Sequence, residues 1–347
     1  MAETIIEKNL DENEVWIKVR NCPNFSDLNA KVKKIIQKSS YWEKYGIDLA
    51  IVLTAIAFVP LTYKLMASDS LLTIITGMII FGMTHSIIAN KGGHAASHGA
   101  FGETKLWNHF ATRFTVEFWG STSAHIGYMI HIKEHHPHTN ITGLGDSSTW
   151  KVPMLPRYIY MFVAPHFIPI VIPFFSMSML IGNFLELVKY SIIAGSGLVL
   201  QVGAFHVFCG YSIPMSIFML FASRSVMAAP YIHFNIFQHI GLPMYSQANR
   251  PKRIYQMASG CLNLDRNPLL DLTLGHTLIN CHVEHHLFPG LSDNMVLTIK
   301  PIVSSFLKEN GLPYNEDSYS NRMFLFLDKY EELMVNAPPL THFIGLQ

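Results

Sequence analysis

The last third of the chain contains the sequence GHTLINCHVEHHLFP, residues 275–289. Three of its histidines, His282, His285 and His286, form an H-x-x-H-H cluster. If the segment is helical, His282 and His286 share a face, because residues four apart are neighbours on a helix. Adjacent positions diverge by about 100°, so His285 and His286 can serve two neighbouring metal ions. One such cluster is weak evidence, and its meaning depends on whether the chain supplies partners.

Two other segments repeat this pattern. His94 and His98 are four residues apart, and the segment His131–His136 combines the same spacing with the tandem pair His135-His136. A single pair spaced in this way is more often incidental than a ligand set, but three sets indicate a metal site. Imidazole binds iron, zinc and copper alike. Because eight histidines exceed the four ligands of a zinc site, the sequence predicts two metal ions in a histidine-rich cage.

The composition indicates a membrane protein. Of 347 residues, 50% are hydrophobic and 14% are charged, whereas roughly 25% are charged in soluble globular proteins. The formal net charge of +1 gives no support for nucleic-acid binding. The four cysteines form no C-x-x-C pair, so neither a disulfide framework nor a cysteine zinc site is indicated. The N-terminus lacks the basic start and apolar core of a signal peptide, so we expect an internal segment to direct membrane insertion.

Four apolar stretches are predicted to cross the bilayer as two helical hairpins, since each approaches the roughly 20 residues that a spanning helix needs. They cover residues 47–65, 71–89, 191–211 and 214–234. Lysines before the first stretch and Lys91 after the second place both ends in the cytosol. A fifth apolar stretch, residues 158–181, contains three prolines that each remove a helical hydrogen bond. Because an odd number of crossings would separate the histidine clusters, this stretch is predicted to lie in the membrane plane or to be re-entrant.

The other segments are predicted to form a cytosolic cap. Residues 1–45 form an N-terminal segment with an amphipathic helix at the membrane surface, residues 46–315 form the membrane domain, and residues 316–347 form a cytosolic tail. Amphipathic helices are also expected over residues 295–310 and 321–335. The predicted fold class is all-α integral membrane: two transmembrane hairpins, or four spans, under a cytosolic helical cap that holds the dimetal site.

In this order, around paired hydrophobic hairpins, the three clusters resemble the histidine boxes of the membrane fatty acid desaturase family. Supporting matches are HGAF at residues 98–101, HPHTN at 136–140 with Asp146 downstream, and EHHLFP at 284–289. The resemblance covers roughly residues 45 to 315. It implies two irons and an N-x-x-x-H element after the fourth span, which Asn235 and His239 fit.

The implied metal ligands are nine histidines, with Asn235 holding a water on one iron. By similarity, one iron takes His94, His131, His136 and His285. The other takes His98, His135, His239, His282 and His286. Residues expected to orient the ligands from outside this set are Glu134, Glu284, His125, His138, His233 and His276. One departure from the family pattern is Ala95, where many relatives carry an acidic residue.

The resemblance implies an O2-dependent oxidoreductase that introduces a cis double bond into an acyl-CoA or acyl-lipid. The sequence contains no His-Pro-Gly-Gly haem motif, so electrons are expected from a separate cytochrome b5 and its reductase. The implied location is the endoplasmic reticulum membrane, with termini and active site cytosolic. Arg250, Lys252 and Arg253 either hold a substrate headgroup or form a positive flank.

Two alternatives remain open at this point. The boxes do not fix the outcome after hydrogen abstraction, so a diiron lipid hydroxylase or other oxygenase carries the same motifs. A non-catalytic membrane protein that keeps a metal site for structure or lipid sensing is the alternative from another class.

Overall fold

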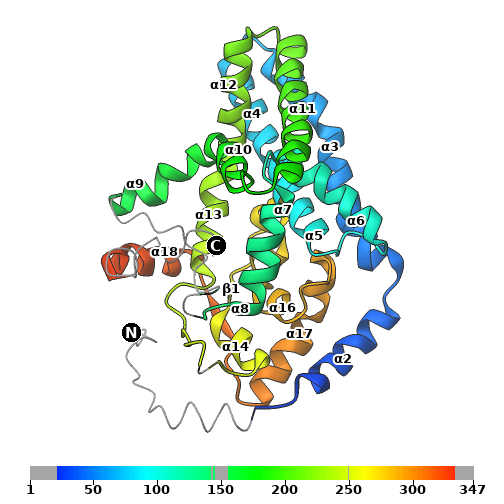
Figure 1. Cartoon of the computed structure of the whole chain (residues 1–347), viewed down its shortest axis with the longest axis vertical. Coiled ribbons are helices and arrows are strands. Elements are labelled where there is room, and N and C mark those ends of the chain that lie inside the picture. The colour runs from blue at the N-terminus through cyan, green and yellow to red at the C-terminus, as the bar shows by residue number, and fades with distance from the viewer. Residues whose placement is uncertain (1–21, 142–143, 145–154, 249, 333–347) are drawn as a thin grey trace.

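A computed structural model describes residues 22–141, 144, 155–248 and 250–332 (Figure 1). Asp146, predicted to support the second box, lies outside the described residues, as do the first part of the N-terminal segment and the end of the C-terminal tail. Apart from one pair of short strands, the described elements are helices.

Four helices are long and apolar enough to cross a membrane, which agrees with the predicted number of spans and identifies a multi-pass membrane protein. They are Trp42–Met66, Leu71–Ser97, Phe184–Cys209 and Ile213–Phe237. The first contains η1 (Trp42–Gly46) and α3 (Ile47–Met66), and the second contains α4 (Leu71–Ser86), η2 (Ile87–Gly92) and α5 (Gly93–Ser97). The third is α11 (Phe184–Cys209), and the fourth contains α12 (Ile213–Arg224), η6 (Ser225–Met227) and α13 (Ala228–Phe237).

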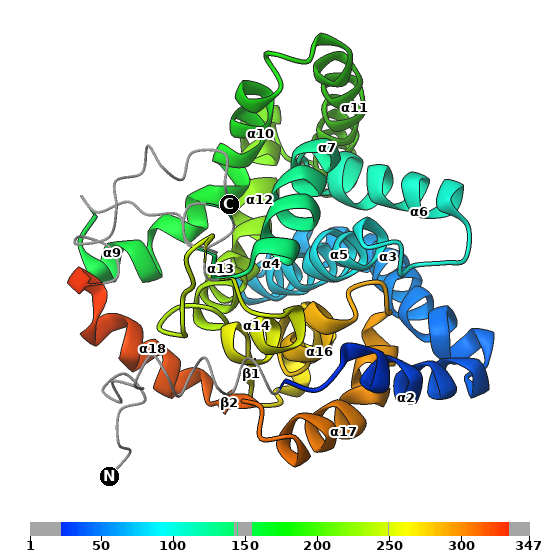
Figure 2. The ribbon, with the colours of Figure 1, turned by 60° about the horizontal axis from the view of Figure 1, so that its bottom comes forward.

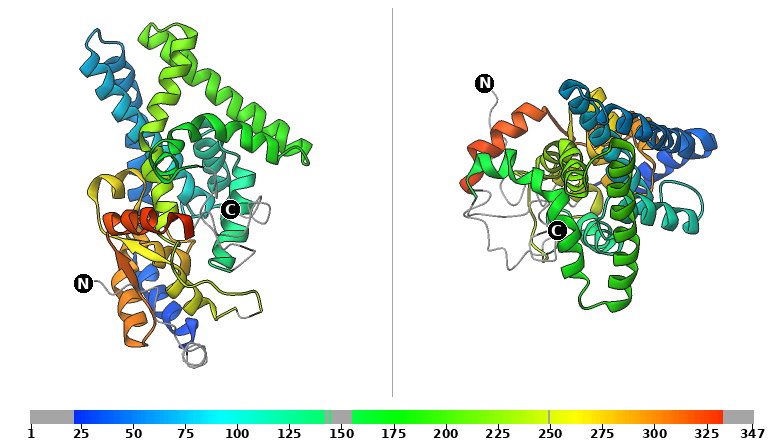
Figure 3. Two further views of the ribbon diagram at one scale, coloured as in Figure 1. Left: turned by 90° about the vertical axis from the view of Figure 1, so that its left-hand side faces the viewer. Right: turned by 90° about the horizontal axis from the view of Figure 1, so that it is seen from above.

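The spans pair as two hairpins whose connecting loops lie at the end of the molecule opposite the cap (Figure 3, left). Glycines allow close packing of the second span against the fourth and of the third span against the segment Arg113–Trp119, as is common in membrane helices. A Cβ at Gly82 would lie 2.5 Å from the carbonyl oxygen of Ser223, and one at Gly197 would lie 1.8 Å from that of Phe118. Larger residues at these two positions would push the helices apart.

The fifth apolar stretch is broken, in keeping with its prolines. It contains α9 (Arg157–Phe162), η5 (Ala164–Phe167) and α10 (Ile168–Met179), and its apolar part, Ala164–Met179, is shorter than the four spans. Five further elements lie between the two hairpins in sequence, and the last two of them contain the second histidine box. These are α6 (Lys105–Thr112), η3 (Arg113–Trp119), α7 (Ala124–Gly127), η4 (Tyr128–His135) and α8 (His136–His138).

The cap contains the C-terminal elements together with α2 (Phe25–Lys38). They are α14 (Arg253–Gly260), β1 (Leu262–Leu264), α15 (Pro268–Thr273), η7 (His276–Leu278), α16 (His282–Leu287), α17 (Asp293–Glu309), β2 (Asn315–Asp317) and α18 (Tyr319–Asp328). The strands β1 and β2 pair in parallel, with Leu262 opposite Asn315. Figure 2 shows α14, α16 and α17 together on the side that comes forward.

Helix α2 packs its apolar face against protein. Its amphipathic pattern was predicted to lie on the membrane surface, but Leu28 and Val32 are fully buried in the cap, in one hydrophobic cluster with Phe306 and Leu307 of α17. The apolar face is therefore satisfied by protein. Helical periodicity predicts that a face is buried, and it does not say what covers the face.

Two hydrophobic cores meet at the histidine boxes. Ala95 and Ala96, which lie between His94 and His98, belong to the core of the spans. Val283 and Leu287, in and beside the third box, belong to the core of the cap. The boxes are therefore anchored from both sides, which fixes their helices relative to one another.

Candidate metal centre

Nine histidines gather into two clusters, within each of which the candidate ligand atoms lie within 4.8 Å of one another. The first, called the five-histidine cluster, contains His94, His98, His131, His136 and His285. The second, called the four-histidine cluster, contains His135, His239, His282 and His286. All nine histidines predicted as ligands are thus brought together.

The first box contributes both of its histidines to the five-histidine cluster. His94 and His98 are four residues apart at helix α5, and their ring centroids are 4.7 Å apart. The ring of His98 also lies 4.5 Å from that of His136. This grouping differs from the division implied by the family resemblance, which gave His98 to the other iron. The reason is local, because helical i, i+4 spacing directs both imidazoles to the same side.

The second box lies on a π-helix, η4 (Tyr128–His135). Its wider turn closes hydrogen bonds between residues five apart, so His131 and His136 point to the same cluster, with Nε2 atoms 3.2 Å apart. His135 turns to the four-histidine cluster, where its ring lies 4.7 Å from that of His239. Sequence spacing alone had suggested i, i+4 pairing of His131 with His135.

The third box divides between the clusters as its tandem histidines predict. His282 and His286 lie on the same side of α16, with ring centroids 4.5 Å apart. His285 points the other way, and its Nε2 is 3.0 Å from Nε2 of His136. His239, in the turn after α13, brings its Nε2 to 2.8 Å from Nε2 of His282.

The contact between His239 and His282 indicates a cation. Nδ1 of His239 lies 2.9 Å from the carbonyl oxygen of Gly260, and Nδ1 of His282 lies 3.0 Å from that of Thr277. Both Nδ1 atoms must therefore carry the proton, which leaves a lone pair on each Nε2 of the neutral rings. Two lone pairs facing each other at 2.8 Å cannot form a hydrogen bond. A metal ion between them would use both, so the residues fit the metal that the boxes predict.

Burial keeps these rings in the form that binds metal. Loss of solvation lowers the pKa of His135, His282 and His286 well below the ordinary value, and neighbouring imidazoles lower it further. The pKa of His239 falls to about 4, again through burial. Neutral imidazole, the metal-binding form, is therefore the stable state at physiological pH.

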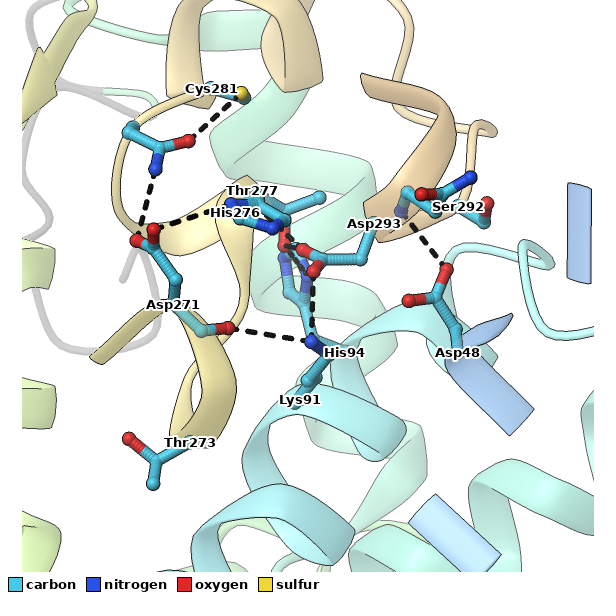
Figure 4. Close-up of polar contacts among 12 residues, drawn as sticks. Asp48, Lys91, His94, Asp271, Thr273, His276, Thr277, Cys281, Ser292 and Asp293 are labelled. Atoms are coloured by element: carbon cyan, nitrogen blue, oxygen red, sulfur yellow. Dashed lines mark hydrogen bonds and ion pairs between the residues drawn. The ribbon is translucent and has the colours of Figure 1, made fainter. Parts of the chain in front are cut away.

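Thr277 contacts one histidine of each cluster. Its hydroxyl lies 3.4 Å from Nδ1 of His94, while its carbonyl oxygen accepts from Nδ1 of His282. Asp293 holds Thr277 in place, because its Oδ1 accepts hydrogen bonds from the backbone N–H at 2.8 Å and from the hydroxyl at 3.1 Å. Lys91 completes the arrangement with Nζ 3.0 Å from Oδ2 of Asp293 (Figure 4). A buried ion pair thus fixes the orientation of ligands in both clusters.

The sequence did not indicate Thr277, because the contact with His94 joins residues 183 positions apart. It pointed instead to acidic neighbours of the ligands. Glu284 accepts from Tyr314 Oη at 2.6 Å and from Asn263 Nδ2 at 3.0 Å. It therefore links α16 to β1, through Asn263, and to Tyr314 just before β2, rather than orienting an imidazole as predicted.

The other predicted orienting residues also have different partners. His138 contacts Arg250, and His233 contacts Tyr319 and the carbonyl of Met161. His276 lies 3.7 Å from Asp271. Among the described residues, Glu134 Oε2 is buried without a hydrogen-bond partner, and His125 lines a separate surface pocket.

The comparisons with known proteins agree with this geometry. Residues 69–318 match the model of the family described as fatty acid desaturase. The chain belongs to the fatty acid desaturase family. The membrane fold, the oxidoreductase class and the desaturation of fatty acyl chains predicted from the boxes are thereby confirmed.

This desaturase is similar along most of its length to proteins named fatty acid desaturase 6. The protein of Bos taurus is 46% identical over 328 residues, which cover 92% of this chain and 94% of the relative. That of Homo sapiens is 44% identical, with 92% and 90% covered, and that of Mus musculus is 43% identical, with 92% and 94% covered. Similarity to this protein was also predicted from residues 143–150, 233–244 and 312–319, and it is confirmed.

Two basic residues of the desaturase donate hydrogen bonds to backbone carbonyls at the second and third boxes. Arg250 donates to the carbonyl oxygen of Pro137 and contacts His138, beside the second box. Arg253 donates to the carbonyl oxygen of His286 at 3.2 Å. These contacts give both residues a structural role in addition to the headgroup or flank roles considered from the sequence.

A cavity of about 270 Å³ opens beside the five-histidine cluster. His94, His131 and Asn235 form one part of its wall, and the amide of Asn235 is held by a hydrogen bond to the carbonyl of Tyr231 at 2.7 Å. Apolar wall residues include Val116, Ile168, Ile172, Met227 and Leu278. The wall extends along the fourth span from Asn235 to Arg224, which is about 16 Å at the rise of a helix.

Proposed function

We propose that the desaturase holds one iron in each histidine cluster and uses O2 and external electrons to introduce a cis double bond into an acyl chain in this cavity. The observation that carries the proposal is the double role of His94 and His131. Both belong to the five-histidine cluster, and both line the cavity. An acyl chain in the cavity would therefore pass directly beside the metal centre.

The donor set supports iron as the metal. Structural zinc sites are closed by four tetrahedral ligands, whereas the five-histidine cluster offers more nitrogen donors than such a site uses. When bound, the two irons would supply O2 activation and hydrogen abstraction from unactivated methylenes, chemistry that side chains alone do not provide. Asn235 is placed in the cavity wall, where it would hold a water on one iron.

The protein would hold the acyl chain in position and exclude water from the cavity. The apolar wall formed by Val116, Ile172 and Met227 favours methylenes over water. Ile168 of the broken helix α10 adds to this wall. Thr277 and Asp293 would keep His94 and His282 in the tautomer with a free Nε2. The double bond would thus form where the held chain passes His94 and His131.

We further propose that electrons come from a separate cytochrome b5 and its reductase, that the substrate is an acyl-CoA or acyl-lipid, and that the desaturase lies in the endoplasmic reticulum with its clusters cytosolic. The positively charged residues before the first span and at Lys91 support this orientation.

Metal analysis and lipid profiling test the proposal together. Purified protein is expected to contain two irons, and cells expressing it are expected to gain a lipid with a new double bond. His285→Ala should abolish the product, while His206→Ala, at an exposed position of the third span, should not. Bound zinc alone, or less than about one iron per chain, would contradict the proposal. A hydroxylated lipid would identify an oxygenase, and an iron-loaded protein without any product would identify a non-catalytic metal protein.

A further inference from the structure

Arg322 of α18 binds the cytosolic end of the fourth span from within the cap. Its side chain is only 5% exposed. Nε donates to the carbonyl oxygen of Phe237 at 3.0 Å, and Nη2 donates to the carbonyl oxygen of Ile240. Within the described part of the chain, no backbone N–H of a turn or loop donates to either oxygen. Carbonyls at a helix C-terminus lack intrahelical partners, so the guanidinium supplies the donors that this turn needs.

The turn that Arg322 binds carries a candidate metal ligand. His239 lies between Phe237 and Ile240, so the two hydrogen bonds from Arg322 flank it on both sides. Its Nε2 is 2.8 Å from Nε2 of His282 in the four-histidine cluster. A shift of this turn would therefore move the imidazole of His239 relative to the other members of the cluster.

The other contacts of the turn come from chain segments beside the histidine boxes. Nδ2 of Asn140, at the end of the HPHTN segment, lies 3.4 Å from the carbonyl oxygen of His239. Nε2 of Gln238 donates to the carbonyl oxygen of Leu278 at 2.5 Å, shortly before the third box. Arg322 differs from these residues because it belongs to the C-terminal helix α18, which contains no histidine box.

Tyr319 fixes α18 beside the fourth span. Tyr319 and Arg322 are three residues apart and therefore share a helix face. The ring of Tyr319 lies 5.6 Å from that of Phe234 and 5.3 Å from that of Phe237, and its hydroxyl contacts Nδ1 of His233. The guanidinium of Arg322 thus extends from a helix that is already packed against α13, which restricts its movement away from the turn.

The charge of Arg322 is compensated by backbone carbonyls rather than by an ion pair. Among the described residues, no carboxylate lies within ion-pair distance of it. Burial lowers the pKa of Arg322, and the charge of Asp317 partly offsets this effect. The negative end of the helix dipole favours a cation at a helix C-terminus. The pKa of His239 is lowered mainly by burial and further by the charge of Arg322, which agrees with the two groups being close.

We infer that Arg322 is a positioning residue of the metal centre, which holds the turn carrying His239 so that this imidazole reaches the four-histidine cluster. The inference rests on the proposed function, because it takes a metal ion to occupy this cluster. The C-terminal helix α18 thereby supports the metal centre from outside the three boxes. Residues that orient ligands typically change metal affinity about 10- to 100-fold, and this is the size of effect expected for Arg322.

Fe²⁺ binding to the purified full chain in detergent tests the inference without requiring turnover. In Arg322→Gln, which loses the charge and the paired donors, the affinity for one of the two irons should fall about 10- to 100-fold. Anaerobic competition with a chelator measures the affinity, and Mössbauer spectra show whether only one iron signal changes. Loss of a positive charge would by itself favour a bound cation, so a lower affinity reports the position of His239 and not electrostatics.

Two further variants separate this role from a general effect on the fold. Arg322→Lys keeps the cation but not the planar fork of the guanidinium, so its affinity should lie between those of the wild type and Arg322→Gln. Arg157→Gln is the matched control, because Arg157 donates to the carbonyl oxygen of Leu327 in α18 at 2.7 Å and pairs with Glu331. It should weaken the attachment of α18 and leave iron binding unchanged. If Arg322→Gln does not fold, the comparison of Arg322→Lys with Arg157→Gln decides.

Two irons bound as tightly in the Arg322 variants as in the wild type would overturn the inference. An equal loss from both sites, or the same loss in Arg157→Gln, would also overturn it, because either result would show a general effect on folding. A wild-type protein that binds no metal would overturn both the inference and the proposed function. A protein that binds two irons in the predicted way but forms no double bond would overturn the proposed function alone, so the two failures are distinguishable.

Discussion

The two histidine clusters differ in how closed they are. In the five-histidine cluster, His94, His98 and His131 are only partly buried, and His94 and His131 face the cavity. In the four-histidine cluster every member is buried, and the Nδ1 atoms of His239, His282 and His286 contact a carbonyl or a hydroxyl. The comparison suggests separate roles. The five-histidine cluster, called open because it faces the cavity, would contact the acyl chain, and the four-histidine cluster, called closed because all its members are buried, would be held rigid by the fold.

Substitutions in the four-histidine cluster should reduce iron content and activity more than those in the five-histidine cluster. His282→Ala removes a ligand and leaves the carbonyl of Thr277 and the ring of His239 without their partner. We expect loss of one iron per chain and a fall in desaturation of at least about 100-fold, since even partners that only orient ligands cost about 10- to 100-fold. Iron analysis and product formation measure both effects. Normal iron content with normal activity would show that His282 is no ligand.

Thr277→Val is expected to affect the five-histidine cluster and to leave the four-histidine cluster unchanged. The change removes the hydroxyl beside His94 and keeps the carbonyl that accepts from His282. We expect a roughly 10- to 100-fold loss of activity or metal affinity, with only one of two iron signals altered in Mössbauer spectra. Thr298→Val, at an exposed position of α17, is the matched control. Equal changes in both signals would argue against the separate roles.

A larger side chain in the cavity wall tests whether the substrate lies beside the five-histidine cluster. Met227→Trp adds bulk to a wall residue that is not a candidate ligand. Overpacking costs typically about 1–3 kcal/mol, so we expect roughly a tenfold or greater loss of activity on long acyl chains, with iron content unchanged. Activity equal to that of the wild type on all chain lengths would place the substrate elsewhere.

The smallest expected effect concerns the support of the third box from the cap. Tyr314→Phe removes the hydrogen bond to Glu284, whose pKa is raised to about 7 chiefly by burial. We expect the free energy of unfolding to fall by about 1–2 kcal/mol, with little change in iron content. Denaturant unfolding in detergent measures it. A loss of iron as large as that in His282→Ala would make Glu284 part of the metal centre.

The sequence predicted the parts that depend on local spacing. Helical spacing placed His94 and His98 on one face, and the tandem His285-His286 correctly implied two clusters. The requirement that all boxes lie on one membrane side led to four spans, which the structure contains. These predictions succeed because a helix fixes the directions of its own side chains.

Other features depend on contacts between distant segments or on irregular helices. The π-helix that turns His131 and His136 to the same cluster has no spacing signal in an α-helical reading. The structure groups His98 with His94 rather than as the family resemblance implied. No pattern marked Thr277 or Asp293, which meet the boxes only after folding. Arg224 is visible in the sequence as a charge within a span, but its neutral acceptors are seen only in the structure.

The most direct test of the two-cluster account is anomalous diffraction at the iron absorption edge from crystals of the purified desaturase. The account predicts two iron peaks, one surrounded by His94, His98, His131, His136 and His285, and one surrounded by His135, His239, His282 and His286. A single peak, a peak outside these rings, or a signal at the zinc edge alone would contradict it.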